Sequence, residues 1–182
     1  MDKDPDARLV QACRNGDRVA FETLLTRYER PIYNVAMRML KDPDDARDIV
    51  QTVFAKVFEK LDQYNFDHKF YSWIYRIAIN ESIDILNARN RQAPLEDEAR
   101  LAGGSEPFEE CNDAERGGVL QAAIMTLSPD YRAVIVLRHF VDRSYQEMAE
   151  ILGIPEKTVK SRLFTARQLL RERLMADGLD GP

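Results

Sequence analysis

Four cationic side chains lie within eleven residues near the end of the sequence, in the stretch K-T-V-K-S-R-L-F-T-A-R. They are Lys157, Lys160, Arg162 and Arg167. Lys and Arg pair with phosphate oxygens and donate hydrogen bonds to guanine, while Ser and Thr bond to several bases. A Phe on the same face can contact the methyl group of thymine. These residue types at this density favour contact with DNA.

The residues around this stretch predict a helix-turn-helix. Ser144 and Glu147 have the spacing of a capping box, which starts a first helix. Gly153 can adopt the left-handed conformation that ends this helix, and Pro155 suits the start of a second one. The inward stripe of the second helix is expected at Val159, Leu163, Ala166 and Leu170.

The outward side of the second helix is the surface expected to read DNA, because residues near the N-terminus of a recognition helix reach base edges. The candidate DNA-contacting residues are Lys157, Thr158, Lys160, Ser161, Arg162, Phe164, Thr165, Arg167 and Gln168. The alternative is a basic amphipathic helix that is only solvated. The capping box, the glycine turn and the aromatic residue on the polar face together favour the DNA-binding interpretation.

The charge of the whole chain does not resemble that of a protein that binds DNA by itself, because the net charge of its 182 residues is −5. The segment 91–116 has eight acidic and three basic residues, whereas the rest of the chain has 23 of each. The segment also contains two prolines and the pair Gly103–Gly104. We therefore expect a domain at 1–92, an acidic flexible linker at 93–113, a second domain at 114–176 and a tail at 177–182.

Apolar residues recur at helical spacing on both sides of this linker, and no segment shows the alternation of a strand. The expected fold is all-α, with two small helical domains. Asp42 is a suitable N-cap and Pro43 suits the first helical turn. We expect Val19, Trp73 and Ile77 to face the core. The expected helices are 12–28, continuing at 32–40, then 43–61, 71–89, 119–127, 130–140, 144–152 and 155–175.

The sequence offers little for catalysis or metal binding. His68 and His139 lie far apart, and neither a nucleophile motif G-x-S-x-G nor a phosphate-binding loop is present. Cys13 and Cys111 are also distant from each other, which disfavours a disulfide framework or a zinc site. No apolar run approaches the roughly 18 residues of a membrane span. We expect a cytoplasmic protein without a catalytic residue, metal or cofactor.

The segment 128–174 resembles region 4 of bacterial sigma factors, and in particular that of the extracytoplasmic-function (ECF) subfamily. Two N-terminal motifs agree with this resemblance. D-D-A-R-D-I-V-Q-T-V-F-A-K-V-F, at 44–58, is similar to region 2.2, and F-Y-S-W-I-Y-R-I-A-I-N-E-S-I-D, at 70–84, is similar to regions 2.3 and 2.4. The order and spacing of the three motifs match a chain of sigma domains 2 and 4.

The resemblance implies two further sites. The region 2.2 helix docks on the clamp helices of the polymerase β′ subunit in this family, which implies core-binding roles for Asp45, Asp48, Gln51, Thr52 and Phe54, with Arg38 and Arg47 as further candidates. Regions 2.3 and 2.4 bind the −10 element, and the preceding loop captures a flipped base. The −10 residues implied are Asn65, Phe66, Asp67, His68, Lys69, Tyr75, Arg76 and Asn80, and Tyr71 lies among them.

The implied function is that of an alternative sigma factor, which brings core RNA polymerase to promoters through −35 and −10 contacts. The implied partners are the β′ clamp helices, the flap of the β subunit, promoter DNA and an anti-sigma factor. A linker of about 20 residues can reach roughly 65 Å, or about 19 base pairs, which is comparable to the separation of the two promoter elements. Thr165 departs from the family, because many relatives carry a basic residue there.

Two alternatives remain at this point. A free-standing helix-turn-helix regulator would normally need a dimerisation helix and would leave the N-terminal motifs without a role. A sigma-mimicking adaptor, which binds anti-sigma proteins instead of DNA, would be expected to have lost Lys160, Ser161 and Phe164, and this chain retains them.

Overall fold

The structure is a computed structural model that describes residues 4, 6–92 and 114–176. Within these residues the chain forms helices and connecting loops without a strand, which confirms the all-α prediction. The expected linker and tail lie outside the described residues. The helices are α1 (Ala7–Arg14), α2 (Arg18–Leu40), α3 (Pro43–Lys60), the short 3-10 helix η1 (Leu61–Gln63), α4 (Phe70–Gln92), α5 (Ala114–Met125), α6 (Pro129–His139), α7 (Tyr145–Leu152) and α8 (Glu156–Ala176).

The N-terminal helices differ from the expected ones. The chain turns between α1 and α2 at Gly16, whose φ of +88° is readily adopted only by glycine. Asp17 then caps α2 by accepting from the amides of Val19 and Ala20 at 2.9 and 3.1 Å. The expected helix start at 12 was therefore wrong. Val19 is 69% exposed because it lies in the first turn of α2, which corrects its expected place in the core.

Helix α3 begins as the sequence predicts. The Asp42 side chain accepts hydrogen bonds from the backbone N–H groups of Asp44 and Asp45 at 2.9 and 3.0 Å, and Pro43 occupies the first turn. Helix α3 contacts α2 and α4, and its apolar stripe belongs to the core that these helices share. Ile49, Val53 and Val57 are buried on this stripe, and so is Leu61, the first residue of η1.

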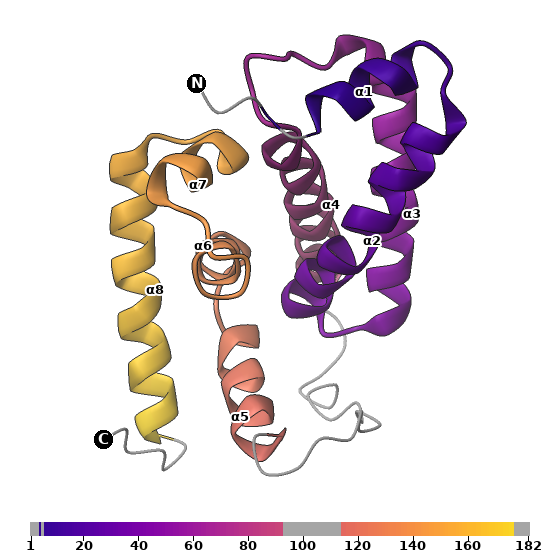
Figure 1. The fold of residues 1–182 in the computed structure, drawn as a ribbon. Coiled ribbons are helices and arrows are strands. Elements are labelled where there is room, and N and C mark those ends of the chain that lie inside the picture. The colour runs from indigo at the N-terminus through magenta and orange to yellow at the C-terminus, as the bar shows by residue number, and fades with distance from the viewer. Residues whose placement is uncertain (1–3, 5, 93–113, 177–182) are drawn as a thin grey trace.

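Helices α2, α3 and α4 pack side by side, and α1 lies across one end of α2 (Figure 1). The buried side of α4 is formed by Ile74, Ala78 and Ile79. Trp73 and Ile77 are only partly buried, at the edge of this core, which corrects the expectation that they lie inside it. The difference arises because α4 packs against α2 and α3 of its own half and against α6 and α7 of the other half.

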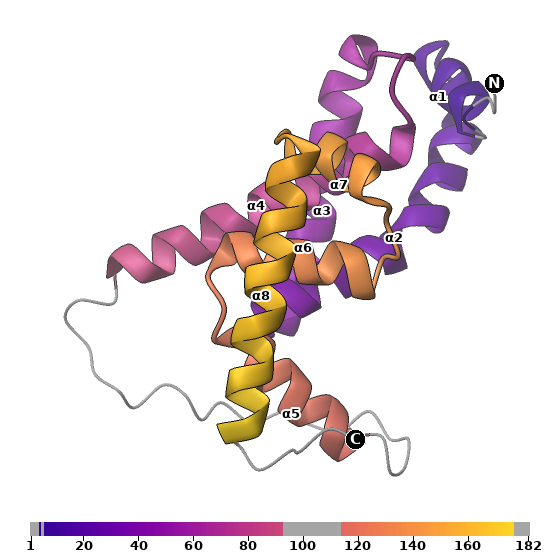
Figure 2. The same cartoon turned by 90° about the vertical axis from the view of Figure 1, so that its left-hand side faces the viewer.

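The second half contains the predicted helix-turn-helix, formed by α7 and α8 (Figure 2). The Glu147 amide donates to the Ser144 hydroxyl, and the Glu147 carboxylate accepts from the Ser144 amide at 2.8 Å, which completes the capping box. Gly153 ends α7 with φ +66°. The four expected inward residues of α8, Val159, Leu163, Ala166 and Leu170, are all buried.

The two halves pack against each other. Helix α4 contacts α6 and α7, and α2 contacts α5 and α6, so residues from both halves form one continuous apolar core. The buried guanidinium of Arg132, on α6, donates to the backbone carbonyl of Met39 at the end of α2. The same guanidinium donates to the carbonyls of Met125 and Leu127 at 2.7 and 3.0 Å. The sequence alone does not determine this orientation of the two halves.

Candidate nucleic-acid interface

Helix α8 presents a polar face with an aromatic residue at its centre. Lys157, Lys160, Ser161 and Gln168 are exposed, and Phe164 is 64% exposed. A single exposed aromatic side chain is not unusual, but here it lies among cationic and hydroxyl groups, where it can contact the methyl group of a thymine. The Lys160 ammonium lies 2.6 Å from the Glu156 carboxylate, and this contact raises the pKa of Lys160. Lys160 is therefore charged at neutral pH, and it can exchange its exposed partner Glu156 for a DNA phosphate.

The remaining α8 candidates lie at the flanks of that face. Thr158 and Thr165 are partly buried, and the Thr158 carbonyl accepts from the Ser161 hydroxyl at 3.0 Å. The guanidinium of Arg162 lies 3.2 Å from the Asp130 carboxylate. The Nε atom of Arg167 lies 3.4 Å from Nε2 of His139. Both arginines thus turn toward α6, at the side of the outward face.

The loop before α4 carries the candidate base-capturing residues. The Asn65 side chain accepts from the Asp67 amide at 2.9 Å and so fixes the turn. Phe66 is exposed between the guanidinium of Arg14, 4.7 Å from its ring centroid, and the ring of Tyr64 at 5.1 Å. Asp67, like Lys69, is exposed. The loop therefore offers an aromatic surface with a cation beside it, as stacking on an unpaired base requires.

Two of the three α4 candidates are accessible. Arg76 and Asn80 are exposed and lie one turn apart, as expected. Tyr75 is only 6% exposed, which corrects its placement on a DNA-facing surface. It lies where α4 meets the second half, with the guanidinium of Arg143 5.8 Å from its ring centroid. Burial raises the pKa of its hydroxyl, against an opposite effect of Arg143.

Several −10 candidates bond to α7 of the helix-turn-helix. His68 Nδ1 lies 2.9 Å from Glu150 Oε1, and Arg76 Nε donates to the Ile151 carbonyl at 3.2 Å. The Tyr71 hydroxyl donates to the Glu147 carboxylate. Burial is the largest influence on Glu147 and acts to raise its pKa, but hydrogen bonds from Tyr71 and Ser144 lower it overall. A pocket of about 190 Å³ remains beside this contact, lined by residues that include His68 and Arg76.

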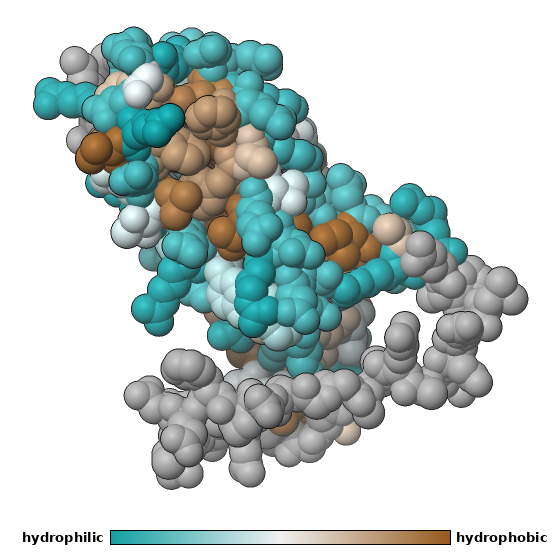
Figure 3. Space-filling model, turned by 90° about the vertical axis from the view of Figure 1, so that its right-hand side faces the viewer, coloured by the Kyte–Doolittle hydropathy of each residue, from teal (hydrophilic) through white to brown (hydrophobic). Residues whose placement is uncertain are grey.

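The outer face of α3 carries the candidate polymerase-binding residues. Asp48 and Gln51 are exposed, Thr52 is partly buried, and Asp45 forms an ion pair with Arg89 of α4. Phe58 extends the same stripe and is 70% exposed. Figure 3 faces the side of the molecule on which α3 lies and shows a hydrophobic patch surrounded by polar surface. An exposed Phe beside acidic and amide groups suits a protein interface.

Phe54 does not belong to that exposed stripe. It is 7% exposed, and its ring meets Phe21 of α2 edge-on at a centroid distance of 6.4 Å, which corrects its predicted outward position. Phe58 was not among the residues predicted for the polymerase-binding face of α3, although it is exposed there. Its spacing of seven residues from Gln51 places it on the same helical face, so the sequence contained the signal.

The other candidates for this face, Arg38 and Arg47, lie apart from each other. The guanidinium of Arg38 donates to Gln121 at 2.9 Å and stacks on Phe140 at 4.3 Å, so it contributes to the contact between the halves. Arg47 is exposed and pairs with Asp44 on α3. Only Arg47 therefore remains available to a partner.

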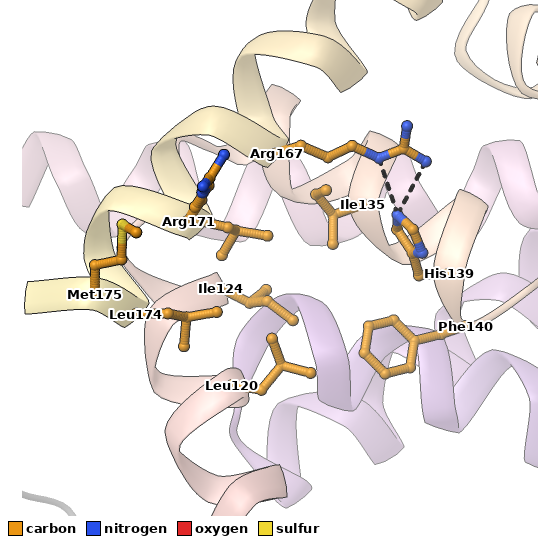
Figure 4. Close-up of a pocket in the computed structure, with 10 residues that line it drawn as sticks. Leu120, Ile124, Ile135, His139, Phe140, Arg167, Arg171, Leu174 and Met175 are labelled. Carbon is orange, nitrogen blue, oxygen red and sulfur yellow. Dashed lines mark hydrogen bonds between the residues drawn. The ribbon is translucent and has the colours of Figure 1, made fainter. Parts of the chain in front are cut away.

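A pocket of about 710 Å³ lies between α5, α6 and α8 (Figure 4). Its walls are apolar, and its charged residues are Arg167 and Arg171, with His139 beside them. Burial lowers the pKa of His139, and the neighbouring cations Arg167 and Arg138 lower it further. The pocket can accept an apolar side chain from a partner whose flanking residues are acidic.

The described residues contain no cluster of His, Cys, Asp and Glu able to hold a metal ion. None of the helices at 7–92 or 114–176 is both long and apolar enough to span a membrane.

Comparison with known proteins identifies the family of this chain. The family profile of sigma-70 region 2 matches residues 24–92, and that of sigma-70 region 4 matches residues 118–170. The ECF RNA polymerase sigma-E factor of Escherichia coli is 33% identical over 180 residues, which cover 93% of this chain and 94% of the relative. The ECF RNA polymerase sigma factor SigW of Bacillus subtilis is 32% identical over 176 residues, covering 91% and 94%.

Solved structures give the same result. CnrH in complex with the cytosolic domain of CnrY is similar with a TM-score of 0.73 and 26% identity, covering 94% of this chain and 98% of that one. The sigma factor RpoE in complex with the anti-sigma factor NepR from Bartonella quintana has a TM-score of 0.69 and 26% identity, covering 86% and 98%. The chain belongs to the ECF family of sigma-70-type RNA polymerase sigma factors.

Proposed function

We propose that this protein binds core RNA polymerase and directs it to specific promoters, with α8 reading the −35 element and the loop and helix α4 reading the −10 element. The observation that carries the proposal is the exposed polar face of α8, with Phe164 at its centre, on a correctly capped helix-turn-helix. Lys157, Lys160 and Ser161 supply phosphate and base contacts on this face. The protein has no catalytic role of its own and acts in the cytoplasm with the polymerase.

For the −10 element we propose the loop residues Asn65, Phe66, Asp67, His68 and Lys69 together with Arg76 and Asn80. A flipped base needs an aromatic or cationic plane to stack on and polar groups to bond its edge. Phe66, with Arg14 stacked on it, supplies the plane, and Asn80 supplies an exposed amide one turn from Arg76. Residues 1–92 would thus form the −10 domain and 114–176 the −35 domain.

For core polymerase we propose two docking surfaces. The first is the α3 stripe of Asp48, Gln51 and Phe58, with Thr52 at its edge, which would meet the β′ clamp helices. The second is the pocket between α5, α6 and α8, whose apolar walls and arginine rim suit an amphipathic helix with acidic flanks, and we assign it to the β flap. A polymerase that supplies most of the non-specific DNA affinity would explain why this acidic chain needs so few phosphate contacts.

We also propose that an anti-sigma factor holds this protein inactive. RpoE is similar over 86% of this chain, and it was solved in complex with the anti-sigma factor NepR. In this chain the two halves pack together in a way that brings the −10 residues against α7. A partner that binds across the closed halves would stabilise that arrangement by mass action.

The decisive experiment combines the purified chain with purified core polymerase. We expect the two to co-purify at moderate salt and to give run-off transcripts from a library of random promoter fragments, whereas core alone gives none. Folded protein that neither binds core nor supports any transcript would overturn the proposal. Binding of duplex operators by the chain without polymerase, as a dimer, would instead favour a free-standing regulator.

A further inference from the structure

We propose that α1 holds the loop before α4 in the conformation that reads the −10 element, with Arg14 as the residue that fixes this loop. The inference rests on the proposed function, because it takes the loop, residues 65–69, as the surface that captures a base. It deepens that function by assigning a role to a helix that precedes all three family motifs. Arg14 is a positioning residue in this role, since it acts on DNA only through the loop.

The guanidinium of Arg14 binds three backbone carbonyl groups next to the loop. Its Nε atom donates to the Leu61 carbonyl at 2.8 Å. One of its terminal nitrogens donates to the carbonyls of Asp62 and Tyr64 at 2.8 and 2.6 Å. These carbonyls belong to η1 and to the residue that follows it, so the arginine fixes the chain where η1 passes into the loop. A planar guanidinium suits this task because its N–H groups point in fixed directions.

The same guanidinium supports the aromatic residue of the loop. It lies 4.7 Å from the centroid of the Phe66 ring, a distance typical of a cation–π contact. The Tyr64 ring meets that of Phe66 edge-on at 5.1 Å. Phe66 nevertheless keeps 41% of its surface exposed. Arg14 therefore fixes the ring from the protein side, while part of the ring stays open to a base.

Asp4 fixes the other end of the loop. Its Oδ2 atom accepts from the amide of Phe70, the first residue of α4, at 2.7 Å. A helix N-terminus needs such an acceptor, and here it comes from a residue 66 positions earlier. The same oxygen lies 3.2 Å from the Tyr64 hydroxyl, and burial together with Asp4 raises the pKa of this hydroxyl. Tyr64 therefore stays protonated and is a donor at neutral pH.

The segment 4–14 is itself fixed to α2. Asp6 is buried, pairs with Arg27 and accepts from the Tyr28 hydroxyl. Val10 of α1 is fully buried in the apolar core. The loop is thus supported by α1, and α1 by α2, all within the first half of the chain.

This support bears on base discrimination. A base is distinguished from its competitors only when the groups that bind it are already in place, because a mobile loop can adjust to several bases. Without Arg14 the loop would lose its contacts at one end and the support of its aromatic ring. We therefore expect the loss of Arg14 to relax the choice of base and not only to weaken binding.

The test compares Arg14→Ala with Arg8→Ala, which removes the same type of side chain from an exposed position on the same helix. Each full chain is combined with core polymerase. Run-off transcripts are measured from a promoter selected with the unmodified chain and from its single-base variants in the −10 element. The readout is the ratio of transcripts between the selected base and the other bases.

We expect Arg14→Ala to reduce this ratio about tenfold at the bases that the loop reads, which is within the range of one base contact. Arg8→Ala should change it by less than about twofold. A loss of stability alone lowers transcription from every promoter by the same factor and leaves the ratio as it was. An unchanged ratio in Arg14→Ala, even with weaker transcription, would overturn the proposal.

Arg14→Lys separates positioning from a direct contact with DNA. Lysine keeps the charge, but its single ammonium cannot reproduce the fork that binds three carbonyls, so it should restore little of the lost ratio. Full recovery with lysine would mean that the charge at this position acts on DNA directly, and the proposal would be wrong.

Trp73, the one tryptophan of the chain, reports on the loop without polymerase. Its ring lies 5.3 Å from that of Tyr64. Acrylamide quenching of its fluorescence should increase about twofold in Arg14→Ala, because a released loop exposes the indole, and should stay the same in Arg8→Ala. Equal quenching in the unmodified chain and Arg14→Ala would show that the loop is held without Arg14, which contradicts the proposal.

Failure of this inference and failure of the proposed function are distinguishable. If the unmodified chain supports no transcription, the proposed function fails and the inference fails with it. If it supports transcription and Arg14→Ala keeps the ratio, only the inference fails. Asp4→Ala, which releases the other end of the loop and should act in the same direction, repeats both measurements if Arg14→Ala does not fold.

Discussion

Two phenylalanines one turn apart on α3 have opposite environments. Phe54 is buried against Phe21, whereas Phe58, which also meets Phe21 edge-on at 5.6 Å, leaves most of its surface in solvent. The Phe54 side chain therefore stabilises the fold, whereas the Phe58 side chain is available to a partner. The residue type is the same, so only the neighbouring helix determines the role.

This difference gives a paired prediction. Phe54→Ala should lower the free energy of unfolding by about 3 kcal/mol, because it leaves a cavity in a packed core. Phe58→Ala should change it by less than about 1 kcal/mol and should instead weaken binding to core polymerase. Urea unfolding and a core-binding titration measure the two effects. A Phe58→Ala chain with unchanged core affinity would remove this residue from the proposed clamp surface.

The face of α8 gives a second residue-scale prediction. Lys160→Ala or Phe164→Ala should reduce promoter-specific transcription by about tenfold, since each removes a contact worth roughly 1–3 kcal/mol of base discrimination. Core binding should be unchanged, because neither residue lies on α3 or in the α5–α6–α8 pocket. Arg171→Ala, on the pocket side of α8, is a useful contrast, as it should affect polymerase binding and not promoter choice.

At the scale of elements, Arg132 connects the ends of two helices with the loop that precedes its own helix. It donates to carbonyls at the ends of α2 and α5 and in the loop that follows α5, and it has no carboxylate partner among the contacts described. Burial lowers its pKa to about 10, so it stays charged at neutral pH. Helix C-termini carry partial negative charge, and a cation that collects their unpaired carbonyls stabilises all of them together.

Arg132→Met is expected to lower the free energy of unfolding by about 3 kcal/mol or more, because it leaves buried carbonyl groups without donors. The same change should loosen the contact between the halves, since one of these carbonyls belongs to α2. Urea unfolding measures the first effect, and small-angle scattering, as a larger radius of gyration, measures the second. A loss of less than about 1 kcal/mol would show that water satisfies these carbonyls equally well.

His139 provides a pH dependence for α6. Its pKa is lowered in the folded chain by burial and by Arg167 and Arg138, so the unfolded chain binds a proton more readily. Stability is then highest above about pH 6.5 and is lost as the pH falls through that value toward the lowered pKa. Urea unfolding at pH 7.5 and 5.5 should show the loss, and His139→Gln should reduce it. An equal loss in the variant would assign the effect to other groups.

At the scale of the whole molecule, the charge of the chain limits its affinity for DNA. The net charge of −5 and the two exposed lysines on α8 provide little general attraction for DNA. We expect weak binding of the chain alone to a random 40-base-pair duplex, with a slope of log K against log salt of about −2 for two phosphate contacts. A slope steeper than about −5 would mean that the protein grips DNA through a larger basic surface than α8 provides.

The parts of this protein that the sequence determined are those set by neighbours along the chain. The cap of α3 at Asp42, the capping box at Ser144, the turn at Gly153 and the buried stripe of α8 were all predicted correctly, because caps and helical periodicity depend on residues a few positions apart. Two of the three family motifs, at 44–58 and 70–84, likewise lie within single helices, α3 and α4, whereas the third spans α6 to α8.

The tertiary structure decided what each helix face meets. It buried Phe54 and Tyr75, turned Arg162 and Arg167 toward α6, and brought α7 against His68 and Arg76. These outcomes depend on residues from 28 to more than 80 positions apart. A periodic pattern gives only the direction in which a side chain leaves its helix, whereas its burial and its partners depend on how the other helices pack around it.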